Sequence, residues 1–402
     1  MPTTSTGTPA DVLDPGLVRR RARLPLLALA LGGFSIGTTE FTTMGLLPQI
    51  AGDLDVSIPT AGHVITAYAL GVVVGAPLLT TAAARVDRRT LLLVLMAAFT
   101  VGNLLSALAP TAGWLVAARF AAGLPHGAFF GVGAAMGAHV AGPGRRGQAV
   151  ATMMAGLTIA NVVGVPLSTV LGQAFGWRVA FVAVGALGLA TLAALWRFVP
   201  GLAVADGVSV RSEARTLRNA RLWVVCAAGA IGFGGMFAVY SYVAPLLTDV
   251  TGLAETTVPL VLALFGVGMT AGTLLGGRLT DRSVPRTVLL GFGTTIVALV
   301  LVAAVAQWVV PGVLAIVALG VTSQVLGLAL QSWLMDLSPE APSLGAALCH
   351  SALNVGNAAG AWAGGLVIAA GLGYVAPAWV GAGLTAAGLV VAVFVLPRRP
   401  AA

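Results

Sequence analysis

Lysine is missing from this sequence of 402 residues, and all 21 basic residues are arginine. Only 8% of the residues are charged, against about 25% in soluble globular proteins. The arginines cluster in short segments between apolar runs, so the composition excludes a water-soluble domain, a disordered chain and a nucleic-acid binder. Without lysine the chain also has no P-loop. The chain therefore cannot use ATP hydrolysis at a P-loop of its own.

Cysteine is scarce as well. Cys226 and Cys349 both lie inside apolar runs, which offers no disulfide framework and no metal-ligand spacing, and we expect them to be small packing residues. The four histidines show no metal-ligand spacing with cysteines or carboxylates. Gly-x-Ser-x-Gly, His-Glu-x-x-His and paired-carboxylate motifs are missing too. We therefore predict no enzymatic activity, no metal and no cofactor.

The sequence does contain long apolar runs. Hydrophobic residues make up 58% of it, and 53 further residues are glycine. Crossing the hydrocarbon core of a bilayer takes about 20 apolar helical residues. Twelve runs meet this length: 24–47, 61–82, 90–109, 113–140, 147–173, 177–198, 220–247, 256–277, 286–306, 309–335, 343–370 and 375–396. The unbroken runs exclude a β-barrel and predict an all-α protein with twelve transmembrane helices in the cell membrane.

The arginines indicate the orientation. With twelve spans, 19 of the 21 arginines lie in the tails and in the loops of one side. The opposite side has Arg178 together with Asp53, Asp55, Asp249 and Glu255. By the positive-inside rule, both termini are predicted to be cytoplasmic. The basic flank of the first run suggests a signal peptide, but the run is long and contains Glu40, so we expect an uncleaved helix.

The chain divides into two similar halves. We predict a cytoplasmic N-terminal tail over 1–23, a six-helix bundle over 24–198, a cytoplasmic linker over 199–219, a second six-helix bundle over 220–396 and a cytoplasmic tail over 397–402. Asn161-Val-Val-Gly164 in span 5 matches Asn357-Ala-Ala-Gly360 in span 11, and Arg85–Arg89 after span 2 matches Arg278–Arg282 after span 8. Such duplication is typical of secondary transporters, which bind substrate between the halves.

Several motifs in the sequence resemble those of a known family of membrane proteins. Gly277-Arg278-Leu279-Thr280-Asp281-Arg282 resembles the loop signature of the major facilitator superfamily, whereas its first-half counterpart has Ala84 where an Asp is usual. Glu40–Pro48, Arg119–Gly127 and Ile159–Pro166 are similar to stretches of the twelve-span drug:proton antiporters, in particular chloramphenicol-resistance exporters and arabinose-efflux-type permeases. The resemblance implies two pseudo-symmetric six-helix bundles around a central cavity, and transport by alternating access.

Three residues are candidates for proton coupling. Glu40 is the acidic residue placed well inside a span, where a carboxylate is costly and normally faces a cavity. Arg119 is the arginine inside a span, and in the family that the chain resembles the span-4 arginine is tied to proton coupling. His126 follows seven residues later on nearly the same face, and its ordinary pKa of about 6.5 suits a relay. For each, the alternative is a structural side chain that anchors neighbouring helices.

The candidate substrate-binding residues form a polar set and an apolar wall: Phe41, Met44, Phe129, Phe130, Asn161, Tyr240, Gln324, Gln331, Asn354 and Asn357. Amides and phenols can orient an uncharged ligand by a few hydrogen bonds. Their alternative role is hydrogen bonding between helices. The candidate gating or packing residues are small residues, a proline and loop charges: Gly123, Gly127, Gly164, Pro166, Arg85, Arg88, Arg89, Asp281 and Arg282.

The sequence thus predicts a proton-coupled exporter of a small, moderately apolar drug, with chloramphenicol or a related amphenicol as the leading substrate. The expected partners are this substrate, protons and the lipid bilayer, with no nucleic acid, and the chain is expected to be a monomer. The alternative cargo is a sugar or a cellular metabolite on the same fold. A channel or an integral-membrane enzyme is a further alternative, for which the sequence shows neither a pore nor a cluster of catalytic residues.

Overall fold

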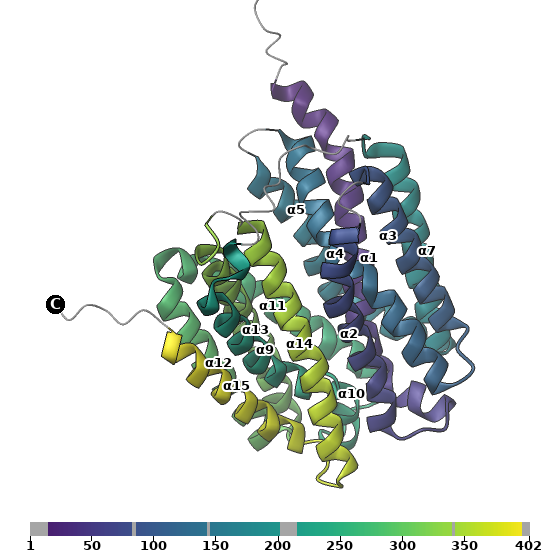
Figure 1. The fold of residues 1–402 in the computed structure, drawn as a ribbon. Helices are drawn as coiled ribbons and strands as arrows, with labels where there is room; N and C mark the ends of the chain where they lie inside the picture. Colours follow the sequence, from purple (N-terminus) through teal and green to yellow (C-terminus); the bar gives the residue numbers. More distant parts are fainter. Residues whose placement is uncertain (1–14, 83–85, 143–144, 202–214, 340–341, 396–402) are drawn as a thin grey trace, which may run out of the picture.

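The computed structural model describes residues 15–82, 86–142, 145–201, 215–339 and 342–395, and every element within these ranges is a helix (Figure 1). The elements are α1 (Pro15–Asp53), α2 (Ile58–Ala82), α3 (Arg88–Ala107), α4 (Ala112–Ala141), α5 (Arg146–Ile159), the π-helix η1 (Ala160–Gly164), α6 (Val165–Phe175), α7 (Trp177–Phe198), α9 (Ala220–Tyr240), α10 (Val243–Pro245), the π-helix η2 (Leu246–Val250), the 3₁₀-helix η3 (Glu255–Thr257), α11 (Val258–Arg282), α12 (Val284–Val305), α13 (Val309–Asp336), α14 (Pro342–Ala369) and α15 (Ala376–Val395).

Twelve of the described helical segments are long and apolar enough to cross a membrane, which confirms the predicted all-α fold with twelve spans. Two spans are less regular than their sequence runs suggest. Span 7 ends as an α-helix at Tyr240 and continues through α10 and η2. Span 5 consists of α5, η1 and α6. Pro166 has no N–H to donate to the carbonyl one turn earlier, and the π-helical turn directly precedes it.

Side-chain caps fix where several helices begin. Asp87 accepts a hydrogen bond from the Thr90 backbone N–H (2.9 Å) at the start of α3, and Thr111 accepts one from the Trp114 N–H (3.3 Å) at the start of α4. Such caps satisfy backbone donors that the first helical turn leaves unpaired. Ala84 and Arg85, at the position of the first-half loop signature, lie outside the described residues, whereas Asp87 is described and is the cap of α3.

The helices form two groups with the same neighbour pattern. In the first bundle (α1–α7), α2 and α3 contact α4, while α1 contacts α5 and both α1 and α3 contact α7. In the second bundle (α9–α15), α11 and α12 contact α13, while α9 contacts α14 and both α9 and α12 contact α15. Each of these contacts of the first bundle has its counterpart six spans later. The internal repeat in the sequence is therefore also a repeat in helix packing.

The two bundles meet along what we call the inter-bundle interface, where α1, α2, η1 and α6 contact α10, α11 and α14. The interface has two main contacts. In one, α2 (span 2) packs against α14 (span 11). In the other, η1 and α6 (span 5) pack against α11 (span 8), so the two contacts are equivalent under the repeat. In Figure 1 the first bundle lies on the right and the second on the left. A transporter that alternates access must separate these contacts.

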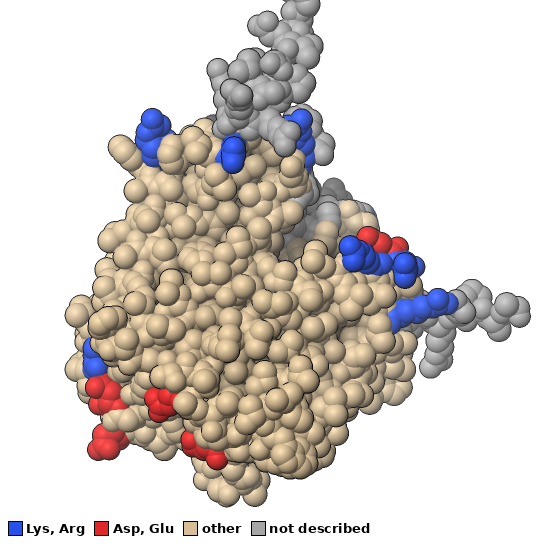
Figure 2. Space-filling view, turned by 180° about the vertical axis from the view of Figure 1, so that it is seen from behind, with Lys and Arg blue, Asp and Glu red and all other residues tan. Residues whose placement is uncertain are grey.

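Charge is divided between the two ends of the molecule. Figure 2 shows most of the basic side chains (blue) toward one end of the molecule and most of the acidic side chains (red) at the other. Between the ends the visible surface is almost free of charge, as expected for a surface facing hydrocarbon. At the acidic end Arg178 forms an ion pair with Asp53 (2.5 Å). We refer to these as the arginine-rich end and the acidic end.

Candidate functional site

Arg119 is buried at the centre of the first bundle and joins three helices. Its Nη1 donates to Thr39 Oγ1 (2.9 Å) and, at 3.5 Å, to Asn103 Oδ1, and its Nη2 donates to the Thr39 carbonyl (3.0 Å). The Thr39 hydroxyl in turn donates to Asn103 Oδ1 (2.5 Å), and the guanidinium lies 4.2 Å from the ring centroid of Tyr68. Arg119 is 0% exposed. A cation so deep in the bundle is stable only because these acceptors and the ring surround it.

Glu40 follows Thr39 on α1 and remains partly exposed. Glu40 and Arg119 form no ion pair, although their charges interact. The two Nη groups of Arg119 are already engaged by Thr39 and Asn103, so the carboxylate keeps its acceptor sites for a proton or a ligand. This arrangement places a cation near the carboxylate without neutralising it by direct contact.

A chain of ring contacts leads from Arg119 to the second bundle. The Tyr68 hydroxyl lies 3.0 Å from His126 Nδ1, and the His126 ring lies 5.3 Å from that of Phe130. The Phe130 ring is parallel within 3° to that of His350, with centroids 6.2 Å apart. Because Phe130 belongs to α4 and His350 to α14, this stack crosses the inter-bundle interface. His126 therefore lies between the Arg119 cluster and the other bundle.

Gly123, Gly127 and Gly131 recur at every fourth position of α4, and we call them the glycine line. The line sets the distance between α2 and α4. A Cβ on Gly123 would lie 2.2 Å from the Tyr68 carbonyl oxygen, and one on Gly127 would lie 2.7 Å from the Ala76 Cβ. At Gly131, the next position of the line, nothing lies within 4 Å of a built Cβ. The close approach at Gly123 holds Tyr68 against both Arg119 and His126.

We expect Gly123→Ala to destabilise the protein by about 1–3 kcal/mol, because overpacking pushes α2 away from α4. The matched control is Gly131→Ala, which meets open space and is expected to be neutral or slightly stabilising, since alanine favours a helix over glycine. Thermal unfolding of the detergent-purified variants measures both effects. Equal unfolding temperatures for the two variants would contradict this reading of the glycine line.

The candidate wall residues fall into two environments. The Phe41 ring lies near those of Phe237 (6.3 Å, 7°) and Tyr240 (5.7 Å, 67°), so the residue after Glu40 joins α1 to the second bundle. Met44 and Phe129 are each 0% exposed. Phe129 lies inside the first bundle, where it meets the position of Gly32 on α1. Of this set, Phe41, Phe130 and Tyr240 are the ones whose rings take part in contacts across or beside the inter-bundle interface.

The candidate amides also differ in placement. Asn161 donates from Nδ2 to the Leu157 carbonyl (3.2 Å). The backbone carbonyl of Asn161 lies against Gly266 of α11. Asn354 donates from Nδ2 to the His350 carbonyl (3.0 Å). The Oδ1 atoms of Asn354 and Asn357 are buried without a partner. Gln324 and Gln331 are half-buried on α13.

The candidate gating residues are spread along the chain. Gly164 faces α1, because a Cβ there would lie 2.2 Å from Thr38 Oγ1. At the arginine-rich end, Arg89 donates to the Trp196 carbonyl, which ties α3 to α7. Arg88 is half-buried, and Asp281 and Arg282 are exposed at the end of α11. Arg85 lies outside the described residues. The described part of the chain holds no group of three His, Cys, Asp or Glu side chains arranged for a metal.

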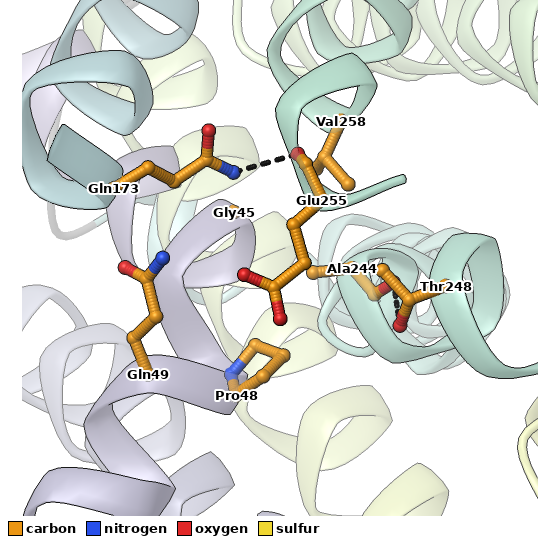
Figure 3. Close-up of a pocket in the computed structure, with 8 residues that line it drawn as sticks. All are labelled: Gly45, Pro48, Gln49, Gln173, Ala244, Thr248, Glu255 and Val258. Atoms are coloured by element: carbon orange, nitrogen blue, oxygen red, sulfur yellow. Dashed lines mark hydrogen bonds between the residues drawn. The ribbon is translucent and has the colours of Figure 1, made fainter. Parts of the chain in front are cut away.

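The structure adds residues that the sequence analysis did not select. Thr39, Asn103 and Tyr68 surround Arg119, and the only signal for them was a polar side chain within an apolar run. At the acidic end a small pocket of ≈ 10 Å³, enough for about one water molecule, lies between the bundles (Figure 3). There Gln173 Nε2 of α6 donates to the Glu255 carbonyl of η3 (2.8 Å), a hydrogen bond that joins the two bundles.

Known proteins share both sequence and fold with this chain. The Major Facilitator Superfamily profile matches residues 29–254 and 225–402, so the chain belongs to this superfamily, which makes it a multi-pass membrane transporter and not an enzyme. The inner membrane transport protein YdhP of Escherichia coli K12 is 43% identical over 87% of this chain and 90% of its own length. A chloramphenicol resistance protein of Streptomyces lividans is 32% identical (87% and 94%), and a probable sugar efflux transporter of Helicobacter pylori is 31% identical (88% and 90%). A crystal structure of a D-xylose-proton symporter superposes with a TM-score of 0.75 at 16% identity, covering 94% of this chain and 98% of that one.

Proposed function

We propose that this member of the major facilitator superfamily is an antiporter that exports a small, moderately apolar drug in exchange for protons. The observation that carries the proposal is Glu40, a partly exposed carboxyl group in the middle of α1 that forms no ion pair with Arg119. A carboxylate at this depth is costly and is normally found on an ion or substrate path. Its position beside an already engaged Arg119 lets it take up and release a proton without breaking the structural cluster.

The proposed cycle follows from competition at Glu40. When the bundles open toward the cytoplasm, drug binding favours release of the proton from Glu40. When they open outward, drug release favours protonation of Glu40. His126 lies one hydrogen bond from Tyr68, which itself lies against Arg119, so His126 and Tyr68 are the proposed relay between this cluster and the interface. Opening requires α2 to part from α14 and η1 with α6 to part from α11.

Chloramphenicol or a related amphenicol is the proposed substrate. The similarity to the chloramphenicol resistance protein supports it. So do the rings of Phe41, Phe237 and Tyr240, which meet where α1 packs on the second bundle, because aromatic side chains with a few polar groups suit a small apolar ligand. The chain is proposed to act as a monomer in the inner membrane, with the arginine-rich end and both termini in the cytoplasm. The segments 1–23, 199–219 and 397–402 are the proposed cytoplasmic tails and linker.

A second candidate is efflux of a sugar or a cellular metabolite. The similarity to the probable sugar efflux transporter favours it, as do the amides of α13 and α14, which suit a hydroxylated ligand. The two candidates share the fold and the coupling group and differ in cargo. Proton movement driven by sugars or polyols, with no response to a drug, would favour the second candidate.

The test of the leading candidate is accumulation of labelled chloramphenicol in a pump-deficient bacterial host that expresses the chain. We expect low accumulation that rises to the empty-vector level when a protonophore collapses the gradient. Accumulation equal to the empty vector throughout, with the protein confirmed in the membrane, would remove amphenicols as substrates. The same cells would then be assayed with sugars and metabolites.

A further inference from the structure

The buried polar atoms of the transmembrane helices differ in whether they have a hydrogen-bond partner. Most donors are bound by the protein's own oxygens: the Nη groups of Arg119 by Thr39 and Asn103, Nδ2 of Asn161 by the Leu157 carbonyl, and the Tyr242 hydroxyl by the Ala361 carbonyl (2.7 Å). Serine and threonine hydroxyls in the spans mostly donate to the carbonyl four residues earlier, as Thr42 does to Thr38. Donors bound in this way are not available to a ligand. Elsewhere in the spans, buried atoms that can donate also lack a partner: Arg119 Nε and the hydroxyls of Thr43, Thr66, Ser241 and Thr295.

In the described part of α14, the two buried polar atoms without a hydrogen-bond partner are acceptors. Because Asn354 donates from Nδ2 to the His350 carbonyl (3.0 Å), the orientation of its amide is fixed and Oδ1 points away from that bond. Asn354 is 6% exposed, and its Oδ1 has no partner. Asn357, nearly one turn further, is 1% exposed and has an unpartnered Oδ1 as well. Buried acceptors without partners are costly, so two on one helix face call for an explanation.

This face lies toward the other bundle. His350, Asn354 and Asn357 follow one another at helical spacing, so they share a face of α14. The His350 ring stacks on Phe130 of α4, and α14 also contacts α2 of the first bundle. Neither α2 nor α14 contains an Asp, Glu or Arg residue along its whole length. These two helices therefore bring no carboxylate or guanidinium to the face.

We propose that this face of α14 is a ligand subsite for an uncharged aromatic molecule, which donates a hydroxyl or amide N–H to Asn354 Oδ1 and places its ring against Phe130 and His350. Asn357 Oδ1 is the second acceptor. The inference rests on the proposed export function and narrows its substrate class to neutral donors. A ligand without a donor leaves Asn354 Oδ1 buried and unpaired, so it binds more weakly.

A matched ligand pair tests the subsite on the full-length protein in nanodiscs. Thiamphenicol and florfenicol share the aryl ring, the benzylic hydroxyl and the amide, and florfenicol has fluorine in place of the primary hydroxyl, so this pair tests the primary hydroxyl as the donor. We expect the wild type to bind thiamphenicol about two- to tenfold more tightly, as one hydrogen bond implies. Asn354→Leu removes the acceptor and is expected to abolish this preference, whereas Asn354→Gln keeps an amide donor and an acceptor oxygen and is expected to retain the preference. The control is Thr295→Val, which removes an unpartnered buried oxygen on α12, outside the interface, and is expected to change nothing.

A second pair, phenyl β-D-glucoside and its tetra-O-methyl ether, makes the test independent of amphenicols. Tighter binding of thiamphenicol than of florfenicol, or of the glucoside than of its methyl ether, supports the subsite when the preference is lost in Asn354→Leu. Equal binding within both pairs in the wild type, binding of none of the four compounds, or a preference that survives Asn354→Leu would overturn it. The chloramphenicol accumulation assay decides the proposed function separately, since export can be intact while the preference is missing.

Discussion

Glu40→Gln is expected to abolish proton-driven export while leaving the protein folded. Glutamine has the shape of the carboxyl group but cannot exchange a proton, so drug binding and proton binding no longer compete. For one proton per neutral drug molecule, a potential of about 100 mV supplies about 2.3 kcal/mol, which sustains a roughly 50-fold concentration ratio. The variant is expected to lower this ratio to one. Drug accumulation in energised inverted membrane vesicles measures the change.

The control for this prediction is Glu255→Gln, which removes an exposed carboxylate at the acidic end. We expect it to retain the gradient, because the contact of residue 255 with Gln173 runs through the backbone carbonyl. Size-exclusion profiles of both variants check that they fold. A Glu40→Gln variant that still builds the full drug ratio would assign proton coupling to another residue.

Arg119→Ala is expected to lower the free energy of unfolding by about 3–5 kcal/mol. The substitution leaves the carbonyl and the hydroxyl oxygen of Thr39 without the guanidinium donors and removes the cation beneath Tyr68. Arg119→Lys keeps the charge but cannot donate to Thr39 from two nitrogens in one plane, so we expect a smaller loss of about 1–3 kcal/mol. Thermal or denaturant unfolding in detergent measures both.

Arg119→Lys also separates a structural role from a role in coupling. We expect the folded lysine variant to bind chloramphenicol with a changed pH dependence, because Arg119 and Glu40 interact through their charges. Binding titrations between pH 5.5 and 8.5 provide the profile. An unchanged profile in a merely destabilised protein would show that Arg119 acts only as an anchor for α1, α3 and α4.

The sequence predicted the fold because run length and arginine placement depend on the bilayer alone. The repeat at Asn161 and Asn357 similarly anticipated that spans 5 and 11 occupy equivalent places, and in the structure they contact spans 8 and 2. The π-helical turn before Pro166 was harder to predict. The proline indicates an irregularity, but the form of the irregularity depends on how α1 and α11 pack against the span.

Contacts between distant helices could not be predicted. The sequence indicates that Arg119 must find partners, but the rotation of α1 about its axis decides that Thr39, and not Glu40, receives its hydrogen bonds. The stack of Phe130 on His350 likewise depends on how the two bundles meet. Phe129 and Phe130 are a further example. They are neighbours on α4, but the Phe129 ring lies inside the first bundle, whereas the Phe130 ring lies at the face of that bundle toward α14.

The most direct test of the central claim is drug-driven proton movement in proteoliposomes that contain the purified chain and a pH-sensitive dye. An outward chloramphenicol gradient is expected to drive protons inward in the wild type and to produce no signal with Glu40→Gln. Proton movement that does not depend on chloramphenicol, or chloramphenicol movement without protons, would contradict proton-coupled exchange at Glu40.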